Sequence, residues 1–266
     1  MRNIILALCF IVLAHPQTTE EKFDIIEHIK SLKNATIAGN TLERLYKKRA
    51  INNAENLYQN SVNSILYIAT KHGKAAGSII DKEGHVVTNY HILEGAEKSK
   101  IQCVFYSESF QQSVKNISSE HALNLELIAF DKSKDLALLK VERSMIGKMF
   151  DSLKPIKMGE DSSIKIAQDV FSIGHPTIEG DPVLWGYARG SINGHKIHSW
   201  KAGENGFKVK AKTIFTQTDA FKGSSGSPLM NKDGEMVGIV TAVHKDGMNI
   251  AVSIDEVHKF VNEVLK

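Results

Sequence analysis

The chain has 266 residues, of which 42% are hydrophobic and 24% are charged, and its formal net charge is +3. This is the composition of an ordinary globular protein, long enough for one large domain or two small ones. Because Lys and Arg are scattered among Asp and Glu, no basic patch indicates a nucleic-acid partner, and we predict none.

The first residues resemble an export signal. Arg2 precedes an apolar run over residues 4–14, which is too short to cross about 30 Å of hydrocarbon as a helix. We therefore predict a signal peptide over residues 1–16 and an exported protein, periplasmic or secreted, with no stable membrane insertion after cleavage. An uncleaved anchor is the alternative interpretation.

Residues 17–60 are polar, with apolar positions at helical spacing, and predict an N-terminal helical arm. Its apolar stripes would pack either on the main domain or against another subunit. The second alternative predicts a homo-oligomer built through the arm, and the pattern does not separate the two.

Residues 61–266 consist of short β-rich segments bounded by Gly, Asn, Asp and Lys, which predict an all-β domain in two halves. The halves cover about residues 61–145 and 155–253, and Pro155 marks irregular backbone between them. Residues 254–265 predict a closing helix. Strands are expected at residues 65–69, 77–80, 86–89, 100–106, 123–130 and 136–141, and then at 169–173, 183–192, 209–216, 228–231, 235–243 and 249–253.

Loss of the signal peptide would remove Cys9 and leave Cys103 as the sole cysteine, so no internal disulfide is expected. The segment around Cys103 is typical of a strand interior. We therefore interpret Cys103 as a buried packing residue rather than a nucleophile.

The segment Gly223-Ser-Ser-Gly-Ser-Pro228 carries the strongest chemical signal. A nucleophilic serine needs a turn that exposes its hydroxyl and directs backbone N–H groups at a developing oxyanion, and flanking glycines permit such a turn. Ser225 fits this description, with the N–H groups of Gly223 and Ser225 as the oxyanion hole.

A serine nucleophile also needs a histidine base that a carboxylate holds in one tautomer. His91 follows the predicted strand at residues 86–89, and Asp135 heads the alternating strand at 136–141. Their order along the chain, His then Asp then Ser, excludes the α/β-hydrolase and subtilisin arrangements and fits the chymotrypsin order. No metal and no cofactor is predicted.

Three segments, residues 76–92, 131–140 and 217–240, resemble the protease domain of the HtrA (Deg) family, and Phe171-Ser-Ile-Gly-His-Pro176 is similar to the strand and turn that open its second barrel. The resemblance covers about residues 57–262. It implies a chymotrypsin-like double β-barrel of six strands each, a cleft between the barrels that holds the triad, and cofactor-free hydrolysis of polypeptides. It also implies a serine endopeptidase that acts on exported or unfolded proteins, often as a trimer.

The sequence departs from this family in several ways. Few residues follow Ser253, which predicts that the family's PDZ domain is absent. Ser224 stands where the family usually has Asn, and Ser227 where it often has Gly. A catalytically silent protein of the same fold that binds polypeptides is therefore kept as the alternative function.

The substrate pocket is predicted from Asp219, Thr241 and Val243. Asp219 lies six residues before Ser225, where trypsin-like enzymes place the acid that binds Arg or Lys. It also belongs to the Gln-Thr-Asp motif of HtrA relatives, which favour aliphatic side chains. Val243, two residues beyond Thr241, would narrow the entrance, so we favour an aliphatic preference over a basic one.

The remaining histidines and tryptophans have structural interpretations. His195 and His198 have no acid at helical spacing, so we expect surface-loop residues rather than a metal site. His175 is expected to cap a turn with Pro176, and His244 to border the cleft or solvent. Trp185 and Trp200 are expected to pack or to line the cleft.

Overall fold

The computed structural model describes residues 54–70, 73–96, 100–112, 114–142, 154–178, 181–218, 223–243 and 247–266. The predicted signal peptide and most of the predicted arm lie outside these residues. Of the arm, residues 54–61 form a helix, which leads through the 3-10 turn η1 (Val62–Ser64) into the first strand. Among the described residues, no helix combines the length and the apolar character needed to cross a membrane.

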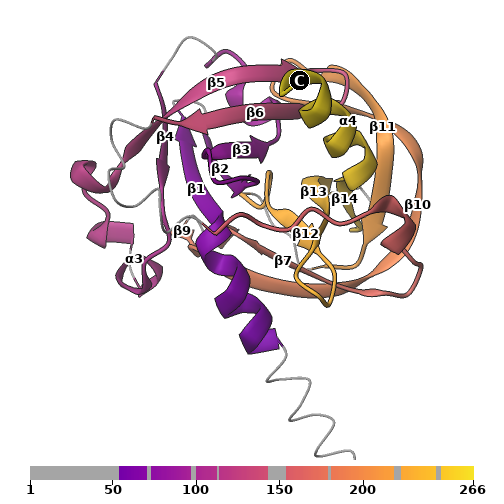
Figure 1. The fold of residues 1–266 in the computed structure, drawn as a ribbon, viewed down its shortest axis with the longest axis horizontal. Coiled ribbons are helices and arrows are strands. Elements are labelled where there is room, and N and C mark those ends of the chain that lie inside the picture. Colours follow the sequence, from indigo (N-terminus) through magenta and orange to yellow (C-terminus); the bar gives the residue numbers. More distant parts are fainter. Residues whose placement is uncertain are drawn as a thin grey trace, which may run out of the picture. The chain divides into compact units, whose positions relative to one another are not determined.

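The first half of the domain is a closed antiparallel barrel of six strands in the order β1-β2-β3-β6-β5-β4 (Figure 1). A short helix, α3 (Glu108–Gln112), and two 3-10 turns, η3 (Val114–Asn116) and η4 (Ser119–His121), connect the fourth strand to the fifth. The strands are β1 (Ile65–Thr70), β2 (Gly73–Ile79), β3 (His85–Thr88), β4 (Ile101–Val104), β5 (Leu123–Asp131) and β6 (Leu136–Val141).

The second half is another closed barrel of six strands, in the order β10-β11-β14-β13-β12-β7. A two-stranded ribbon of β8 (Thr177–Ile178) and β9 (Asp181–Pro182) lies between β7 and β10 along the chain, and the 3-10 turn η7 (Asp161–Ser163) precedes β7. The predicted all-β, chymotrypsin-like double barrel is therefore confirmed. Its strands are β7 (Asp169–Gly174), β10 (Gly186–Ala202), β11 (Phe207–Thr216), β12 (Pro228–Met230), β13 (Met236–Val243) and β14 (Asn249–Ser253).

Strand β1 shows how the barrels share apolar surface. Successive side chains of a strand point to opposite faces. Leu66 and Ile68 accordingly lie in the core of the first barrel, whereas Ile65 and Tyr67 belong to the cluster that fills the second barrel and the junction. Both faces are buried, which explains why this segment is a continuous apolar run rather than an alternating one.

The hairpin of β10 and β11 is longer than predicted. The pattern indicated a strand over residues 183–192, but β10 continues to Ala202. Its first part, Gly186–Ser191, pairs with β7, and Ile192–Ala202 pairs with β11 through an irregularity between Ile192 and Gly194. The added part was missed because it is polar and partly exposed on both faces. His195 and His198 lie in this strand, so the prediction that they occupy a surface loop was wrong.

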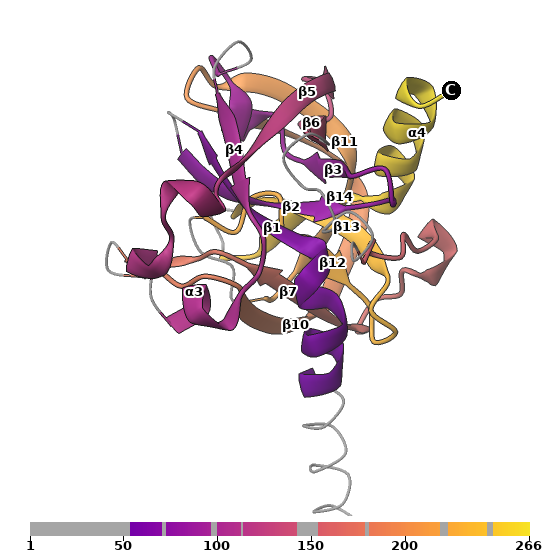
Figure 2. The same ribbon diagram turned by 60° about the vertical axis from the view of Figure 1, so that its left-hand side comes forward.

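The predicted closing helix is confirmed as α4 (Ile254–Val264). Its buried side chains, Val257, Phe260 and Val261, recur at helical spacing and pack on the second barrel. Figures 1 and 2 show α4 beside β11 and beside β6 of the first barrel, and contacts join it to both. The helix therefore spans the junction of the barrels.

Candidate active site

Three strand ends place the predicted catalytic side chains together. His91 is the first residue of η2 (His91–Leu93), which is separated from the end of β3 by two residues, and Asp135 ends the turn between β5 and β6. Ser225 lies in the loop before β12. The first barrel thus supplies the histidine and the aspartate, and the second supplies the serine.

The side chains of these residues form one hydrogen-bonded line. Nδ1 of His91 lies 2.8 Å from Oδ2 of Asp135, and Nε2 lies 3.0 Å from Oγ of Ser225. The carboxylate can only accept, so Nδ1 carries the proton and Nε2 is free to accept one from the serine hydroxyl. The imidazole is 20% exposed and the carboxylate is fully buried, so a substrate can reach the base but water cannot reach the acid. This arrangement can remove a proton from Ser225.

Buried donors hold the Asp135 carboxylate. The backbone N–H of His91 donates to Oδ1 at 2.8 Å, and the hydroxyl of Thr241 on β13 donates to Oδ2. A buried carboxylate is costly without such partners. Thr241 was also predicted to line the substrate pocket, and that role stays a prediction beside the contact with the aspartate. The sequence offered no signal for this contact, because Thr241 and Asp135 lie 106 positions apart.

The backbone of Asp135 has a φ of +57°, in the left-handed region where Asp is several-fold enriched among non-glycine residues. Its carbonyl oxygen accepts a hydrogen bond from the N–H of Tyr90 at 3.3 Å. The sharp turn therefore directs the carboxylate at the ring of His91 while the peptide stays tied to the histidine segment.

The loop of Ser225 docks closely against the first barrel. The carbonyl oxygen of Ser225 accepts a hydrogen bond from the N–H of Ala76 on β2 at 2.9 Å. Gly226 has a φ of +80°, and a Cβ there would lie 2.0 Å from the carbonyl oxygen of Ala76. Only glycine fits this contact, which explains the glycine after the serine.

Gly223 also occupies a position that requires glycine. Its φ is +99°, and a Cβ would lie 2.3 Å from the carbonyl oxygen of His175. Among the predicted pocket residues, Asp219 lies outside the described residues. His244, which was expected to border the cleft or solvent, also lies outside them. Val243 ends β13, but its side chain is not among those described. The predicted pocket therefore stays a prediction.

His175 is a buried link between the barrels. Its Nε2 donates to the carbonyl oxygen of Leu66 at 3.2 Å, and its Nδ1 accepts from the N–H of Trp185 at 3.1 Å. Burial lowers the pKa of His175 from 6.5 to about 3, so the ring is neutral. The prediction that His175 caps a turn with Pro176 was wrong, because the ring instead packs edge-on against Tyr67 and Trp185.

Both tryptophans pack, as predicted. Trp185 is fully buried, and its Nε1 donates to the carbonyl oxygen of Ile65 at 2.8 Å. Trp200 is half-buried and packs against the core of the second barrel. Trp185 therefore adds a second hydrogen bond between the second barrel and β1.

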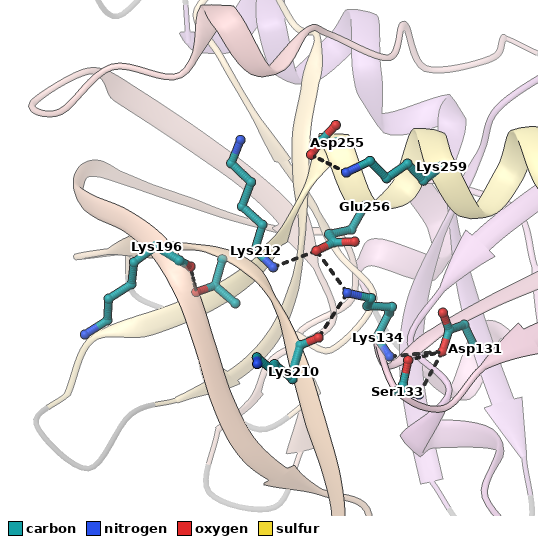
Figure 3. A network of polar contacts seen from close by, with 10 residues as sticks. Asp131, Ser133, Lys134, Lys196, Lys210, Lys212, Asp255, Glu256 and Lys259 are labelled. Carbon is teal, nitrogen blue, oxygen red and sulfur yellow. Dashed lines mark hydrogen bonds and ion pairs between the residues drawn. The ribbon is translucent and has the colours of Figure 1, made fainter.

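The turn that carries Asp135 is itself held by side chains. Oδ1 of Asp131 accepts hydrogen bonds from the N–H and hydroxyl of Ser133, at 2.8 and 2.7 Å, and from the N–H of Lys134 at 3.2 Å (Figure 3). This is the local pattern by which Asp side chains stabilise turns. Asp135 follows directly, so these bonds help to set its unusual backbone.

The same turn contacts the second barrel and helix α4 (Figure 3). Nζ of Lys134 lies 3.2 Å from Oε1 of Glu256 and 3.1 Å from the carbonyl oxygen of Lys210. Glu256 Oε1 also accepts from the N–H of Lys212 at 2.8 Å, and the carbonyl oxygen of Ser133 accepts from the N–H of Lys210 at 2.9 Å. We call these the outer contacts. The ion pair among them is partly open to water, since the side chain of Lys134 is 30% exposed and that of Glu256 11%.

Two other kinds of chemistry, a metal site and a reactive cysteine, have little support among the described residues. In the part of the chain that the structure describes, no group of three or more His, Cys, Asp and Glu side chains could hold a metal ion. Cys103 is 1% exposed in β4, and burial raises its thiol pKa to about 12. Its interpretation as a packing residue is confirmed, because such a thiol is protonated and shielded.

Comparison with known proteins finds similarity to peptidases and proteases. The family described as "Trypsin-like peptidase domain" matches residues 75–239. Protease Do-like 1 of Arabidopsis thaliana chloroplasts is 25% identical over 73% of this chain and 40% of its own length. A probable periplasmic serine endoprotease, DegP-like, of Buchnera aphidicola is 28% identical over 90% of this chain and 47% of its own length. The chain thus spans about half or less of these two relatives.

Solved structures share the fold. The crystal structure of Deg5 is 25% identical and superposes with a TM-score of 0.58, covering 79% of this chain and 92% of Deg5. An HtrA-type protease, AlgW, solved with a tripeptide, is 18% identical and superposes with a TM-score of 0.63, covering 80% of this chain and 64% of AlgW. The second likeness is one of fold.

Proposed function

The chain belongs to the trypsin-like peptidase domain family, as a protease domain of the HtrA (Deg) type, and on that premise we propose that it is a serine endopeptidase acting through Ser225, His91 and Asp135. The observation that carries this proposal is the line of hydrogen bonds from Asp135 through His91 to Ser225, at 2.8 and 3.0 Å. These distances fall within the range that general-base catalysis requires.

In the proposed mechanism, Oγ of Ser225 attacks a peptide carbonyl while Nε2 of His91 takes its proton. The His91 imidazolium then returns that proton to the leaving amine, and an acyl-enzyme forms on Ser225. Water, activated by the same ring, releases the acid product. Asp135 stays ionised, fixes the tautomer of His91 and stabilises its charged form.

The negative charge that develops on the carbonyl oxygen would be stabilised by the N–H groups of Gly223 and Ser225. The positive φ of Gly223 and its close approach to His175 support this assignment, because both require a glycine at that position. The assignment predicts that Gly223→Ala lowers kcat.

The proposed substrates are exported or unfolded polypeptides. The name of the Buchnera aphidicola relative, a probable periplasmic serine endoprotease, supports an exported location for this chain as well. We propose an aliphatic preference at the residue before the cleaved bond. Cleavage-site profiling on a peptide library tests this preference. A dominant preference for Lys or Arg would instead assign Asp219 as the acid that binds a basic side chain.

An assay of casein cleavage by the wild type and by Ser225→Ala tests the proposed function. A fluorophosphonate, which reacts with activated serines, should label the wild type and not the variant. The alternative of a silent polypeptide-binding protein predicts a folded wild type that binds casein but neither cleaves it nor takes the label. The aligned catalytic side chains argue against that alternative.

A further inference from the structure

We propose that Asn89 is a positioning residue that aligns all three catalytic segments through one buried side-chain amide. This inference rests on the proposed function and adds to it a residue outside the Ser225, His91 and Asp135 line. Asn89 lies between β3 and His91, two residues before the base, and it is fully buried.

The amide of Asn89 contacts both other segments. Its Oδ1 accepts a hydrogen bond from the N–H of Gly226, the residue after the nucleophile, at 2.7 Å. Its Nδ2 donates to the carbonyl oxygen of Asp135 at 3.2 Å. One partner is a donor and the other is an acceptor, so together they distinguish the oxygen of the amide from its nitrogen. With His91 two residues away, one side chain spans the base, the acid and the nucleophile.

Neither partner depends on Asn89 alone. The N–H of Gly226 also lies 2.9 Å from the carbonyl oxygen of Val240, and the carbonyl oxygen of Asp135 also accepts from Tyr90. Loss of the amide therefore leaves no buried backbone group without a partner. The contribution of Asn89 is geometric, because it is the side chain that sets how far the Gly226 segment lies from the Asp135 turn.

This distance matters for the reaction. Ser225 and Gly226 belong to the second barrel and are placed against the first by Ala76 and by Asn89. The Ser225 hydroxyl must stay within hydrogen-bond reach of His91, and a displacement of about 1 Å can lower a rate by roughly 100-fold. We therefore expect loss of the amide to lower kcat with little change in KM.

The test compares wild type, Asn89→Ala and Asn89→Asp with the control Asn231→Ala. Asn231 is equally suited as a buried amide, since it is 3% exposed and binds the backbone of Asp233 and Glu235 through Oδ1, but it lies in the turn between β12 and β13. Peptide cleavage gives kcat and KM. Saturating fluorophosphonate labelling counts active sites, so kcat is expressed per folded molecule.

We expect kcat of Asn89→Ala to fall by about 10- to 100-fold with KM within about 2-fold of the wild type. Asn89→Asp keeps the size and the acceptor but, when ionised, cannot donate to Asp135. Its charge should also shift the acid limb of the kcat/KM profile to higher pH, because a second carboxylate near His91 favours the imidazolium. Asn231→Ala should lose stability and keep its kcat.

Several outcomes would overturn this inference. If Asn89→Ala and Asn89→Asp kept the wild-type kcat per labelled site, or if Asn231→Ala lost as much kcat as Asn89→Ala, the amide would be structural only. If Asn89→Ala did not fold, Asn89→Asp with an unchanged kcat and pH profile would decide against it. A wild type that neither cleaved nor took the label would overturn the proposed function, and this inference with it.

Discussion

Two of the regions in which polar contacts join the barrels differ in character. The inner contacts, which Asn89 makes with the backbone of Gly226 and Thr241 makes with the carboxylate of Asp135, are buried and use neutral side chains around that carboxylate. The outer contacts centre on the ion pair of Lys134 with Glu256, which is partly open to water. A buried polar group must be matched, whereas an exposed ion pair contributes little. The inner contacts should therefore govern activity, and the outer contacts should adjust stability.

The largest expected effect tests whether the inner region is a catalytic site at all. Ser225→Ala should lower kcat/KM by roughly 10⁴-fold or more, because it removes the nucleophile. The free energy of unfolding should change little, since only a hydroxyl is lost. Steady-state kinetics and urea unfolding measure the two quantities, and a variant that kept its activity would place the chemistry elsewhere.

A second prediction concerns the neutral contacts between the barrels. The pKa of His175 is about 3 in the folded protein, against 6.5 for an ordinary histidine. As the pH falls, the ring is therefore protonated in the unfolded chain at a higher pH than in the folded protein. The stability that His175 contributes is complete above pH 6.5 and is lost as the pH falls toward about 3. From pH 7 to 5 the loss should be about 2 kcal/mol.

Urea unfolding at pH 7 and pH 5, for wild type and His175→Gln, measures this loss. The glutamine can donate and accept but does not titrate, so the variant should lose about 2 kcal/mol less than the wild type between these pH values. Other histidines titrate in both proteins and cancel in this difference. Equal losses in the two proteins would show that His175 is not a neutral link.

The third prediction tests whether Thr241 acts on catalysis through Asp135 or on substrate preference through the pocket. Thr241→Val keeps the shape but removes a donor from the buried carboxylate of Asp135. Hydrogen bonds to charged groups are worth about 1.5–3 kcal/mol, so kcat should fall by roughly 10-fold or more. Peptide-library profiling should give the wild-type preference, and a changed preference with normal kcat would show that Thr241 acts through the pocket.

The smallest expected effect is at the outer contacts. Glu256→Gln keeps the acceptor for the N–H of Lys212 but removes the charge that faces Lys134. Partly exposed ion pairs contribute about 0–1 kcal/mol, so the stability loss should be of that size and should shrink in 1 M salt. The matched control Lys259→Gln breaks a more exposed pair with Asp255 on the same helix. A large loss of kcat in Glu256→Gln would show that the outer contacts also align the triad.

Features with local causes could be predicted from the sequence, whereas contacts between residues far apart in the chain could not. Strands such as β1 and β6 were predictable because their apolar residues are continuous or regular, and the motif around Ser225 was predictable because glycines there have local reasons. The contacts of Asn89 and Thr241 with Asp135 join residues 46 and 106 positions apart, and no local pattern indicates them. His175 was misassigned for the same reason, since its partner Leu66 lies 109 positions away.

The extension of β10 shows a different limit. Residues 193–202 are polar and contain glycine, so their pattern does not favour a strand. Their pairing with β11 supplies the backbone hydrogen bonds instead. A partner strand can thus impose a structure that local propensity does not favour.

The burial of Cys103 gives the molecule an internal reporter. A thiol with a pKa of about 12 that is 1% exposed should resist alkylation while β4 stays closed. In a chain with Cys9→Ser, the rate at which iodoacetamide modifies the remaining thiol would measure how often the first barrel opens. Fluorophosphonate labelling of Ser225 requires both barrels to be assembled. Comparison of the rates of the two reactions would therefore show how opening of the first barrel relates to assembly of the complete active site.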